Sequence, residues 1–274
     1  MIQTFSKWLF ALLFLLTSFA YASGQTDKEP FDQSDQAIQS SQSNRGEVFK
    51  SPRDIDIPIA EIVPADRLAS LSGAFRPDDT LSLHVALPEN YDPQNPPGLF
   101  VYVSPSPSGE PPANWYKTLS QNNFIYISVN DQGNLVQGRL RIITAAFAVE
   151  YVEGHYAVNE ARSIISGFSG GGRMSTIILE TLPGVFEGAV MMGGATLWQG
   201  DEAAMAQTLG NGAYVFMTGS EDHARSEVNR SARQYKKAGI KAVKVMNIRG
   251  LNHELPRRTD FKKAVEFLSE KLPN

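Results

Sequence analysis

The sequence contains no cysteine among its 274 residues. The chain therefore forms no disulfide and cannot be attached to lipid through an amino-terminal cysteine. It also lacks the H-E-x-x-H pattern, and with four histidines and no thiol it shows no cluster typical of a zinc site. We therefore expect neither a metal nor another cofactor. A formal net charge of -4 gives no electrostatic reason to expect nucleic acid as a partner.

An apolar run near the amino end is short for a membrane span. Lys7 precedes apolar residues from Trp8 to Phe19, and Ala20-Tyr21-Ala22 has the small-x-small pattern of a cleavage site. Residues 1–22 therefore predict a secretory signal peptide, and the mature protein is expected to be secreted or periplasmic. An uncleaved anchor is the alternative, but a spanning helix needs ~20 apolar residues. We expect no stable membrane insertion after cleavage.

Residues 23–54 have few large apolar side chains and are rich in Gln, Ser, Asp and Asn, which predicts a disordered polar linker. Residues 55–274 are expected to form one catalytic domain, which at roughly 220 residues buries most of its apolar surface without disulfides. Short apolar strands alternate there with helices, so the fold class is α/β, with a mostly parallel sheet covered by helices on both faces. Strands are expected at 80–87, 98–103, 124–129, from 163 to the serine at 169, and at 188–192, 213–218 and 242–248. Helices are expected at 115–121, 138–152, 170–181, 225–238 and 259–272.

A glycine-flanked serine ends one of these strands. Ser169 stands between Gly167 and Gly171, after an apolar strand and directly before a helix. This arrangement is typical of a nucleophile elbow, a tight turn that exposes a serine hydroxyl at the carboxyl edge of a sheet. The five-residue G-x-S-x-G pattern also occurs by chance, so the strand and helix around it carry the interpretation.

A nucleophilic serine needs a base, and the chain has four histidines. His253 lies in a glycine- and proline-marked loop between the last strand and the last helix, where a base is expected. His84 falls within a strand, and His155 lies at the amino end of the elbow strand. His223 directly follows Asp222, an adjacency that we expect to point its ring away from the site.

The base needs a carboxylate, and Asp222 follows the penultimate strand in the sequence Gly219-Ser220-Glu221-Asp222. We favour Asp222 because it preserves the chain order Ser, Asp, His. The alternatives are Glu221, next to Asp222 in the sequence, and Asp201, which lies in the loop after the preceding strand.

An oxyanion hole needs two donors. The first is the amide of Gly170, and the second is expected from the loop 104–109 after the strand at 98–103. Pro105 and Pro107 have no N–H, so Ser106 is the candidate. The alternative is that this Pro- and Ser-rich stretch is only a surface loop.

The region from about Thr80 to Leu272 resembles the α/β-hydrolases, and in particular the secreted esterase and polyhydroxyalkanoate-depolymerase-like branch, which includes feruloyl and acetylxylan esterases. The resemblance implies a single domain without a sizeable cap, with Ser169 as nucleophile, His253 as base and Asp222 as acid. It also implies Gly170 as the first oxyanion amide. The usual His-Gly after the third strand is here Ser104-Pro105. The residues that carry the resemblance are Ala86-Leu87-Pro88-Glu89-Asn90-Tyr91, Gly167-Phe168-Ser169-Gly170-Gly171, Gly219-Ser220-Glu221-Asp222 and Asn252-His253-Glu254-Leu255-Pro256.

These features predict an exported serine hydrolase that cleaves carboxylic esters through an acyl-enzyme. Only the connection from Gly193 to Gly212 separates two strands after the elbow helix, which leaves no room for a helical cap. The site is therefore expected to be open, and its substrate a small or polymeric ester. Trp198 is a candidate substrate contact, with ordinary loop packing as the alternative.

Two other functions fit the same pattern. A serine peptidase of the prolyl-oligopeptidase type shares the elbow and the order of the three residues, but usually carries a gating domain. A non-catalytic binding protein on the same scaffold is the other alternative, since fold does not imply function. The oligomeric state is left open.

Overall fold

The computed structural model describes residues 52–71 and 73–273, all within one compact unit. The predicted signal peptide at 1–22 and the linker up to residue 51 lie outside the described residues. No helix within the described ranges combines the length and apolar character needed to cross a membrane.

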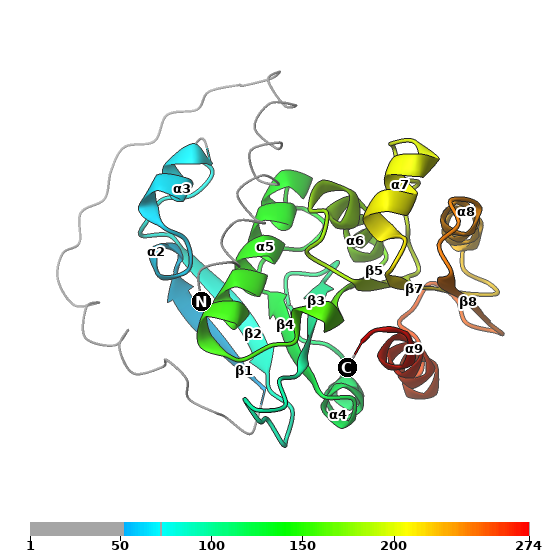
Figure 1. Ribbon diagram of the computed structural model, residues 1–274, viewed down its shortest axis with the longest axis horizontal. Coiled ribbons are helices and arrows are strands. Elements are labelled where there is room, and N and C mark those ends of the chain that lie inside the picture. Colours follow the sequence, from blue (N-terminus) through cyan, green and yellow to red (C-terminus); the bar gives the residue numbers. More distant parts are fainter. Residues whose placement is uncertain (1–51, 72, 274) are drawn as a thin grey trace. The chain divides into compact units, whose positions relative to one another are not determined.

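A single eight-stranded sheet forms the centre of the domain, in the order β1-β2-β4-β3-β5-β6-β7-β8 (Figure 1). Strand β2 pairs antiparallel with β1 and β4, and the remaining pairs are parallel. The predicted mostly parallel sheet is therefore confirmed. The strands are β1 (Arg53–Pro58), β2 (Thr80–Ala86), β3 (Gly98–Val103), β4 (Phe124–Val129), β5 (Ser163–Phe168), β6 (Gly188–Met192), β7 (Ala213–Gly219) and β8 (Ala242–Ile248).

Helices cover both faces of this sheet because successive strand residues point to opposite sides. In β7, Val215 packs in the same apolar cluster as helix α9, whereas Tyr214 and Phe216 pack against Tyr235 of α8. Figure 1 shows α4 and α9 on one side and α5 and α6 on the other. The helices are α2 (Ile59–Ile62), α3 (Ala65–Ser70), α4 (Ala113–Gln121), α5 (Gly138–His155), the 3-10 turn η1 (Glu160–Arg162), α6 (Gly170–Thr181), α7 (Glu202–Leu209), α8 (Arg225–Lys237) and α9 (Arg258–Lys271).

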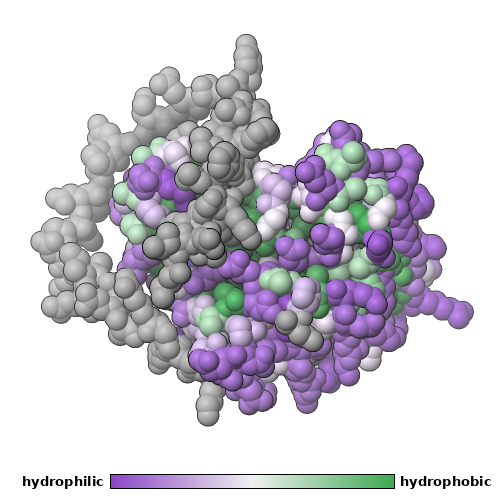
Figure 2. Space-filling model, viewed as in Figure 1, coloured by the Kyte–Doolittle hydropathy of each residue, from purple (hydrophilic) through white to green (hydrophobic). Residues whose placement is uncertain are grey.

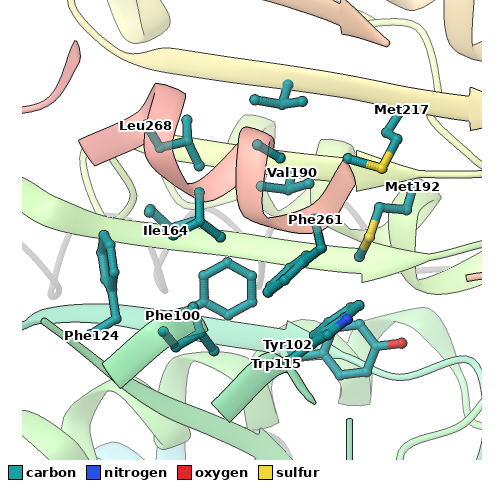
Figure 3. Packing of buried hydrophobic residues seen from close by; sticks show 14 of the residues in the cluster. Phe100, Tyr102, Trp115, Phe124, Ile164, Val190, Met192, Met217, Phe261 and Leu268 are labelled. Atoms are coloured by element: carbon teal, nitrogen blue, oxygen red, sulfur yellow. The ribbon is translucent and has the colours of Figure 1, made fainter. Parts of the chain in front are cut away.

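An aromatic stack joins α4 to α9 beneath the centre of the sheet. The rings of Trp115 and Phe261 lie 3.9 Å apart between centroids and are inclined by 6°. Phe100 of β3 meets Phe261 edge to face, with centroids 5.8 Å apart (Figure 3). All three side chains are fully buried. Burial of such large apolar surfaces stabilises the strands whose carboxyl ends carry the candidate residues.

Five elements go beyond the sequence-based expectation: β1, α2, α3, η1 and α7. Strand β1 begins at Arg53, within the last residues of the predicted linker, and its alternation buries Ile55 and Ile57. Helix α7 lies in the connection between β6 and β7, where the Asp201 carboxylate accepts a hydrogen bond from the amide of Ala204 (2.6 Å). This connection, described throughout, holds no other helix or strand, so the expected absence of a sizeable cap agrees with the fold.

The face of the molecule shown in Figure 2 is largely hydrophilic, and hydrophobic residues show through in small separate areas. Among the described residues, Leu135 and Leu197 are the large hydrophobic side chains that stand exposed. Both lie in loops that follow the carboxyl ends of strands, the edge where ligands of such sheets bind.

Candidate active site

Ser169 lies on a strained turn between β5 and α6. Its φ of 53° is in the left-handed region, which residues with a side chain rarely adopt. Gly167 and Gly171 permit this turn because their backbones pass close to other chain segments. A Cβ added at Gly167 would lie 2.7 Å from the nitrogen of Gly172, and one at Gly171 would lie 2.9 Å from the carbonyl carbon of Val103. The turn therefore has the form of the predicted nucleophile elbow.

Three predicted side chains meet at this turn. His253 Nε2 lies 2.8 Å from Ser169 Oγ, and His253 Nδ1 lies 2.8 Å from Asp222 Oδ1. The carboxylate of Asp222 is buried, the imidazole is partly exposed, and the hydroxyl lies at a half-buried position. The order hydroxyl, imidazole, carboxylate is the geometry of a proton relay to and from the serine oxygen.

Asp222 and His253 meet because their loops are bonded to each other. The amide of Ser220 donates to the carbonyl of Ile248 (2.8 Å), and the amide of Gly250 donates to Oγ of Ser220 (2.8 Å). A third bond joins the amide of Glu221 to the carbonyl of Leu251 (3.1 Å). These bonds tie the loop after β7 to the loop after β8, although the two lie some 30 residues apart in the chain.

The Asp222 carboxylate is held by further donors. Oδ1 accepts a hydrogen bond from the amide of Ala224 (2.8 Å), and Oδ2 accepts one from the hydroxyl of buried Thr218 (3.1 Å). The ring of Phe168, next to the nucleophile, packs against His253 with centroids 5.0 Å apart. The imidazole is thus fixed by a carboxylate on one side and by an aromatic ring on another.

The rival carboxylates have other partners. Asp201 caps α7, and exposed Glu221 accepts a hydrogen bond from its neighbour Ser220 (3.0 Å). Among the described carboxylates, Asp222 is the one hydrogen-bonded to His253.

The remaining histidines differ in their surroundings. His84 is buried between Asp54 (2.7 Å) and the hydroxyl of Tyr116 (2.6 Å), where it ties β2 to β1 and α4. Hydrogen bonds from Asn130 and His84 lower the pKa of the Asp54 carboxyl. His155 ends α5, with Nδ1 on the carbonyl of Tyr151 (2.7 Å).

The expectation for His223 is wrong. Its ring does not turn away: it lies against His253, with centroids 4.2 Å apart, and Nδ1 is 3.8 Å from Asp222 Oδ1. The amide of Arg225 donates to the carbonyl of Asp222 (3.1 Å), and within this turn the neighbouring side chains of Asp222 and His223 both lie beside His253. Adjacency in the sequence therefore did not decide the direction of this ring.

The chain is similar in fold to solved structures, and part of its sequence matches a protein family. Residues 144–270 match the prolyl oligopeptidase family. The chain superposes on S-formylglutathione hydrolase from Staphylococcus aureus with a TM-score of 0.58 at 12% identity, covering 80% of this chain and 96% of that one. An esterase from Thermogutta terrifontis gives 0.53 at 16% identity, with 70% and 89% covered. Dipeptidyl peptidase 4 from Porphyromonas gingivalis gives 0.55 at 16% identity, with 71% of this chain but 34% of that one covered. No curated protein sequence matches the chain.

The protein has an α/β-hydrolase fold. Its neighbours of this fold include both esterases and peptidases, and the chain spans about a third of the length of the peptidase. The family match and the neighbours together support a serine hydrolase, which the geometry around Ser169 also favours.

An ion pair joins the nucleophile helix of this hydrolase fold to α8. Arg173 donates to both carboxylate oxygens of Glu227, at 2.7 and 2.9 Å, and Glu227 also accepts a hydrogen bond from the amide of Ala195 (3.1 Å). Burial raises the pKa of Glu227, but the bonds from Arg173 and Ala195 outweigh it and leave that pKa below its usual value. The pair links the loops that follow β5, β6 and β7.

In the loop predicted to supply the second oxyanion donor, the candidate amide of Ser106 is hydrogen-bonded within the loop itself. The amide of Ser106 donates to Oγ of Ser104 (3.2 Å), and Pro105 has no N–H. The loop after β4 instead brings the side chain of Asn134 against Gly170. Asn134 was not among the predicted site residues, because its one signal in the sequence is a position shortly after the carboxyl end of a strand.

Trp198 lies half-buried in the connection after β6. Its backbone amide donates to Oε1 of Gln234 (2.9 Å), and its carbonyl accepts from Nε2 of the same side chain (3.1 Å). These bonds fix the loop to α8, and a substrate contact by Trp198 stays a prediction.

Asp222, His223 and His253 form the one group among the described residues whose ligand atoms, all within 4.8 Å of one another, could hold a metal ion. Binding there would require loss of the proton shared between Asp222 and His253. A metal ion bound there would therefore break the contact between Asp222 and His253 on which the proton relay to Ser169 depends.

Proposed function

We propose that the protein is a serine hydrolase that cleaves carboxylic esters, with Ser169 as nucleophile, His253 as general base and Asp222 as the carboxylate that orients the imidazole. The supporting observation is the pair of 2.8 Å contacts that join the three side chains. A serine hydroxyl is a weak nucleophile unless a base can take its proton.

The first half of the reaction forms an acyl-enzyme. Ser169 Oγ bonds to the carbonyl carbon while His253 Nε2 accepts the hydroxyl proton, and the carbonyl electrons move to oxygen. The amide of Gly170, at the amino end of α6, donates to this oxyanion. His253 then gives its proton to the alcohol, which leaves as the tetrahedral intermediate collapses.

The second half reverses the roles with water as the nucleophile. His253 takes a proton from water, the resulting hydroxide adds to the acyl carbon, and Ser169 leaves with the proton returned by His253. Throughout, the buried carboxylate of Asp222 holds Nδ1 protonated and stabilises the imidazolium.

A peptidase is the second candidate, because residues 144–270 match the prolyl oligopeptidase family. We favour esters because the connection between β6 and β7 contains only the eight-residue helix α7. Such an open site suits a small ester or an ester group on a polymer, and Trp198 is proposed as a contact to it.

The test compares purified wild-type protein with Ser169→Ala on esters from acetyl to long-chain, on feruloyl, acetyl-xylan and polyhydroxybutyrate substrates, and on peptide amides. Wild type should hydrolyse esters faster than amides, and Ser169→Ala should lose several orders of magnitude in kcat. Ser70→Ala, at an exposed position of α3, is the matched control and should keep full activity.

Two results would overturn parts of the proposal. Full ester hydrolysis by a folded Ser169→Ala protein would show that Ser169 is not the nucleophile. Peptide amides cleaved faster than every ester, with the same dependence on Ser169, would assign the site to a peptidase.

A further inference from the structure

Two consecutive residues of the loop after β3, Pro105 and Ser106, have no free backbone N–H. The nitrogen of Pro105 lies 3.6 Å from the place where a Cβ on Gly171 would stand, so Pro105 borders the first turn of α6 but has no hydrogen to donate. The next amide, on Ser106, donates to Oγ of Ser104 (3.2 Å). A second oxyanion donor is therefore to be sought outside these two residues.

The loop after β4 lies directly on this segment. The amide of Asn134 donates to the carbonyl of Pro105 (2.9 Å), and the amide of Asp131 donates to the carbonyl of Pro107 (2.7 Å). Gly133 allows the close approach, since an added Cβ would lie 2.8 Å from the carbonyl carbon of Ser106. Two backbone hydrogen bonds thus fix Asn134 at the end of β3.

The side-chain amide of Asn134 lies against Gly170, the residue that follows the nucleophile. A Cβ added at Gly170 would overlap Oδ1 of Asn134 and would lie 2.9 Å from Nδ2. The side-chain amide of Asn134 thus fills the space that a side chain at position 170 would take. That space adjoins the backbone N–H of Gly170, the first oxyanion donor.

Arg141 sets the direction of this amide. Nη1 of Arg141 lies 3.4 Å from Oδ1 of Asn134, and Nη2 donates to the carbonyl of Ser104 (2.8 Å). A guanidinium has only donors, so the oxygen of the amide must face it. Nδ2 then faces the other way, and no described residue offers it an acceptor within hydrogen-bond distance.

We infer that Nδ2 of Asn134 is the second donor of the oxyanion hole, beside the amide of Gly170, and that Arg141 is its positioning residue. The inference rests on the proposed function. When Ser169 Oγ bonds to the carbonyl carbon and His253 takes the proton, the negative charge that forms on the carbonyl oxygen accepts hydrogen bonds from both donors. A side-chain amide thereby replaces the backbone donor that Pro105 cannot supply.

Asn134→Asp separates this role from a structural one. Aspartate has the same size and keeps an oxygen toward Arg141, but it has no N–H. Removing one oxyanion donor lowers kcat by about 10²–10³-fold. The kcat of Asn134→Asp and that of the uncharged Asn134→Ala should therefore both fall by that factor, while KM changes by less than about 3-fold. Asn95→Asp, exposed before β3 at the other end of that strand, is the matched control and should keep the wild-type kcat.

The rate of Ser169 labelling by a fluorophosphonate gives a readout that needs no ester, because the phosphonyl oxygen occupies the same hole. Labelling of both variants should slow by a similar factor while their melting temperatures stay near that of wild type. If Asn134→Asp keeps the wild-type kcat and labelling rate, the inference is overturned and the hydrolase proposal stands. The same holds if Asn134→Asp loses activity but Asn134→Ala does not. Wild-type protein that neither labels nor hydrolyses, and so resembles Ser169→Ala, would overturn both.

Discussion

Ser169 can take its unfavourable backbone conformation because Gly167 and Gly171, two residues before and after it, have no side chains to clash with the backbones beside them. Gly167 packs on the backbone of the first turn of α6, and Gly171 packs on the end of β3. A positive φ costs on the order of 1–3 kcal/mol at a residue with a side chain, so the surrounding contacts have to hold Ser169 in place. The glycines are thus part of the geometry that presents the Ser169 hydroxyl.

Gly171→Ala should therefore destabilise the protein and disturb the elbow. The added methyl would meet the Val103 carbonyl, and overpacking of this kind costs about 1–3 kcal/mol of unfolding free energy, which urea denaturation measures. Ester hydrolysis should fall as well, since the methyl pushes α6 away from β3.

Gly154→Ala is the control for this substitution. Gly154 is an exposed helical glycine near the end of α5, and an added Cβ there meets no atom within 4 Å. Alanine should leave stability unchanged or raise it by up to about 1 kcal/mol. Equal stability of the two variants would contradict the packing argument for Gly171.

At the scale of secondary-structure elements, the Arg173–Glu227 pair ties α6 to α8. Both side chains are a little over one-third exposed, so solvent screening limits the contribution of the pair to stability. Its geometric role is larger, because Glu227 also accepts from the loop after β6. Helix α6, which begins after Ser169, is thereby held to α8, which follows the loop of Asp222.

Glu227→Gln should lower the unfolding free energy at pH 7 by about 0.5–1 kcal/mol. The pKa of Glu227 is lower in the folded protein than its usual 4.5, so ionisation favours the folded state. The stabilisation is complete above about pH 4.5 and is lost as pH falls through the lower folded value. Denaturation at several pH values should show that the difference between wild type and variant shrinks over that acidic range.

Glu266→Gln is the matched control, because its i,i+4 pair with Lys262 lies on the exposed side of α9. Loss of such a pair should cost less than about 0.5 kcal/mol. A difference between wild type and Glu227→Gln that grows as pH falls would have the wrong sign for the ion pair.

At the scale of the whole molecule, we propose that the chain is exported and that residues 1–22 are removed. The reason is the short apolar run followed by Ala20-Tyr21-Ala22, in which small residues stand at the positions that a signal peptidase reads. The mature chain should then begin at Ser23.

Intact-mass analysis of protein from the periplasm or medium of an expressing bacterium checks this start. Ala22→Arg is the control, because a large charged side chain at the cleavage position should leave the precursor uncut. Wild-type protein that keeps Met1 and stays in the cytoplasm would contradict export.

Local pattern was enough to predict much of the domain. The largely apolar runs at 98–103 and 124–129 match β3 and β4 residue for residue. The elbow helix begins directly after Ser169, as its glycines indicate. Strand β1 was missed because Arg53–Pro58 is short and half polar, and it becomes a strand by pairing with β2.

Chain order and residue type likewise predicted that Ser169, Asp222 and His253 would lie together, as their 2.8 Å contacts show. Each stands just past the carboxyl end of a strand, and such ends share one edge of a parallel sheet. Only the folded sheet decided which loops touch: that His223 lies against His253, that the Ser106 amide is used within its own loop, and that Asn134 lies over Gly170. The spacing of apolar residues and the positions of glycine and proline carry information about neighbours along the chain. Contacts between loops separated by 30 or more residues depend instead on strand order and on how closely two backbones can approach.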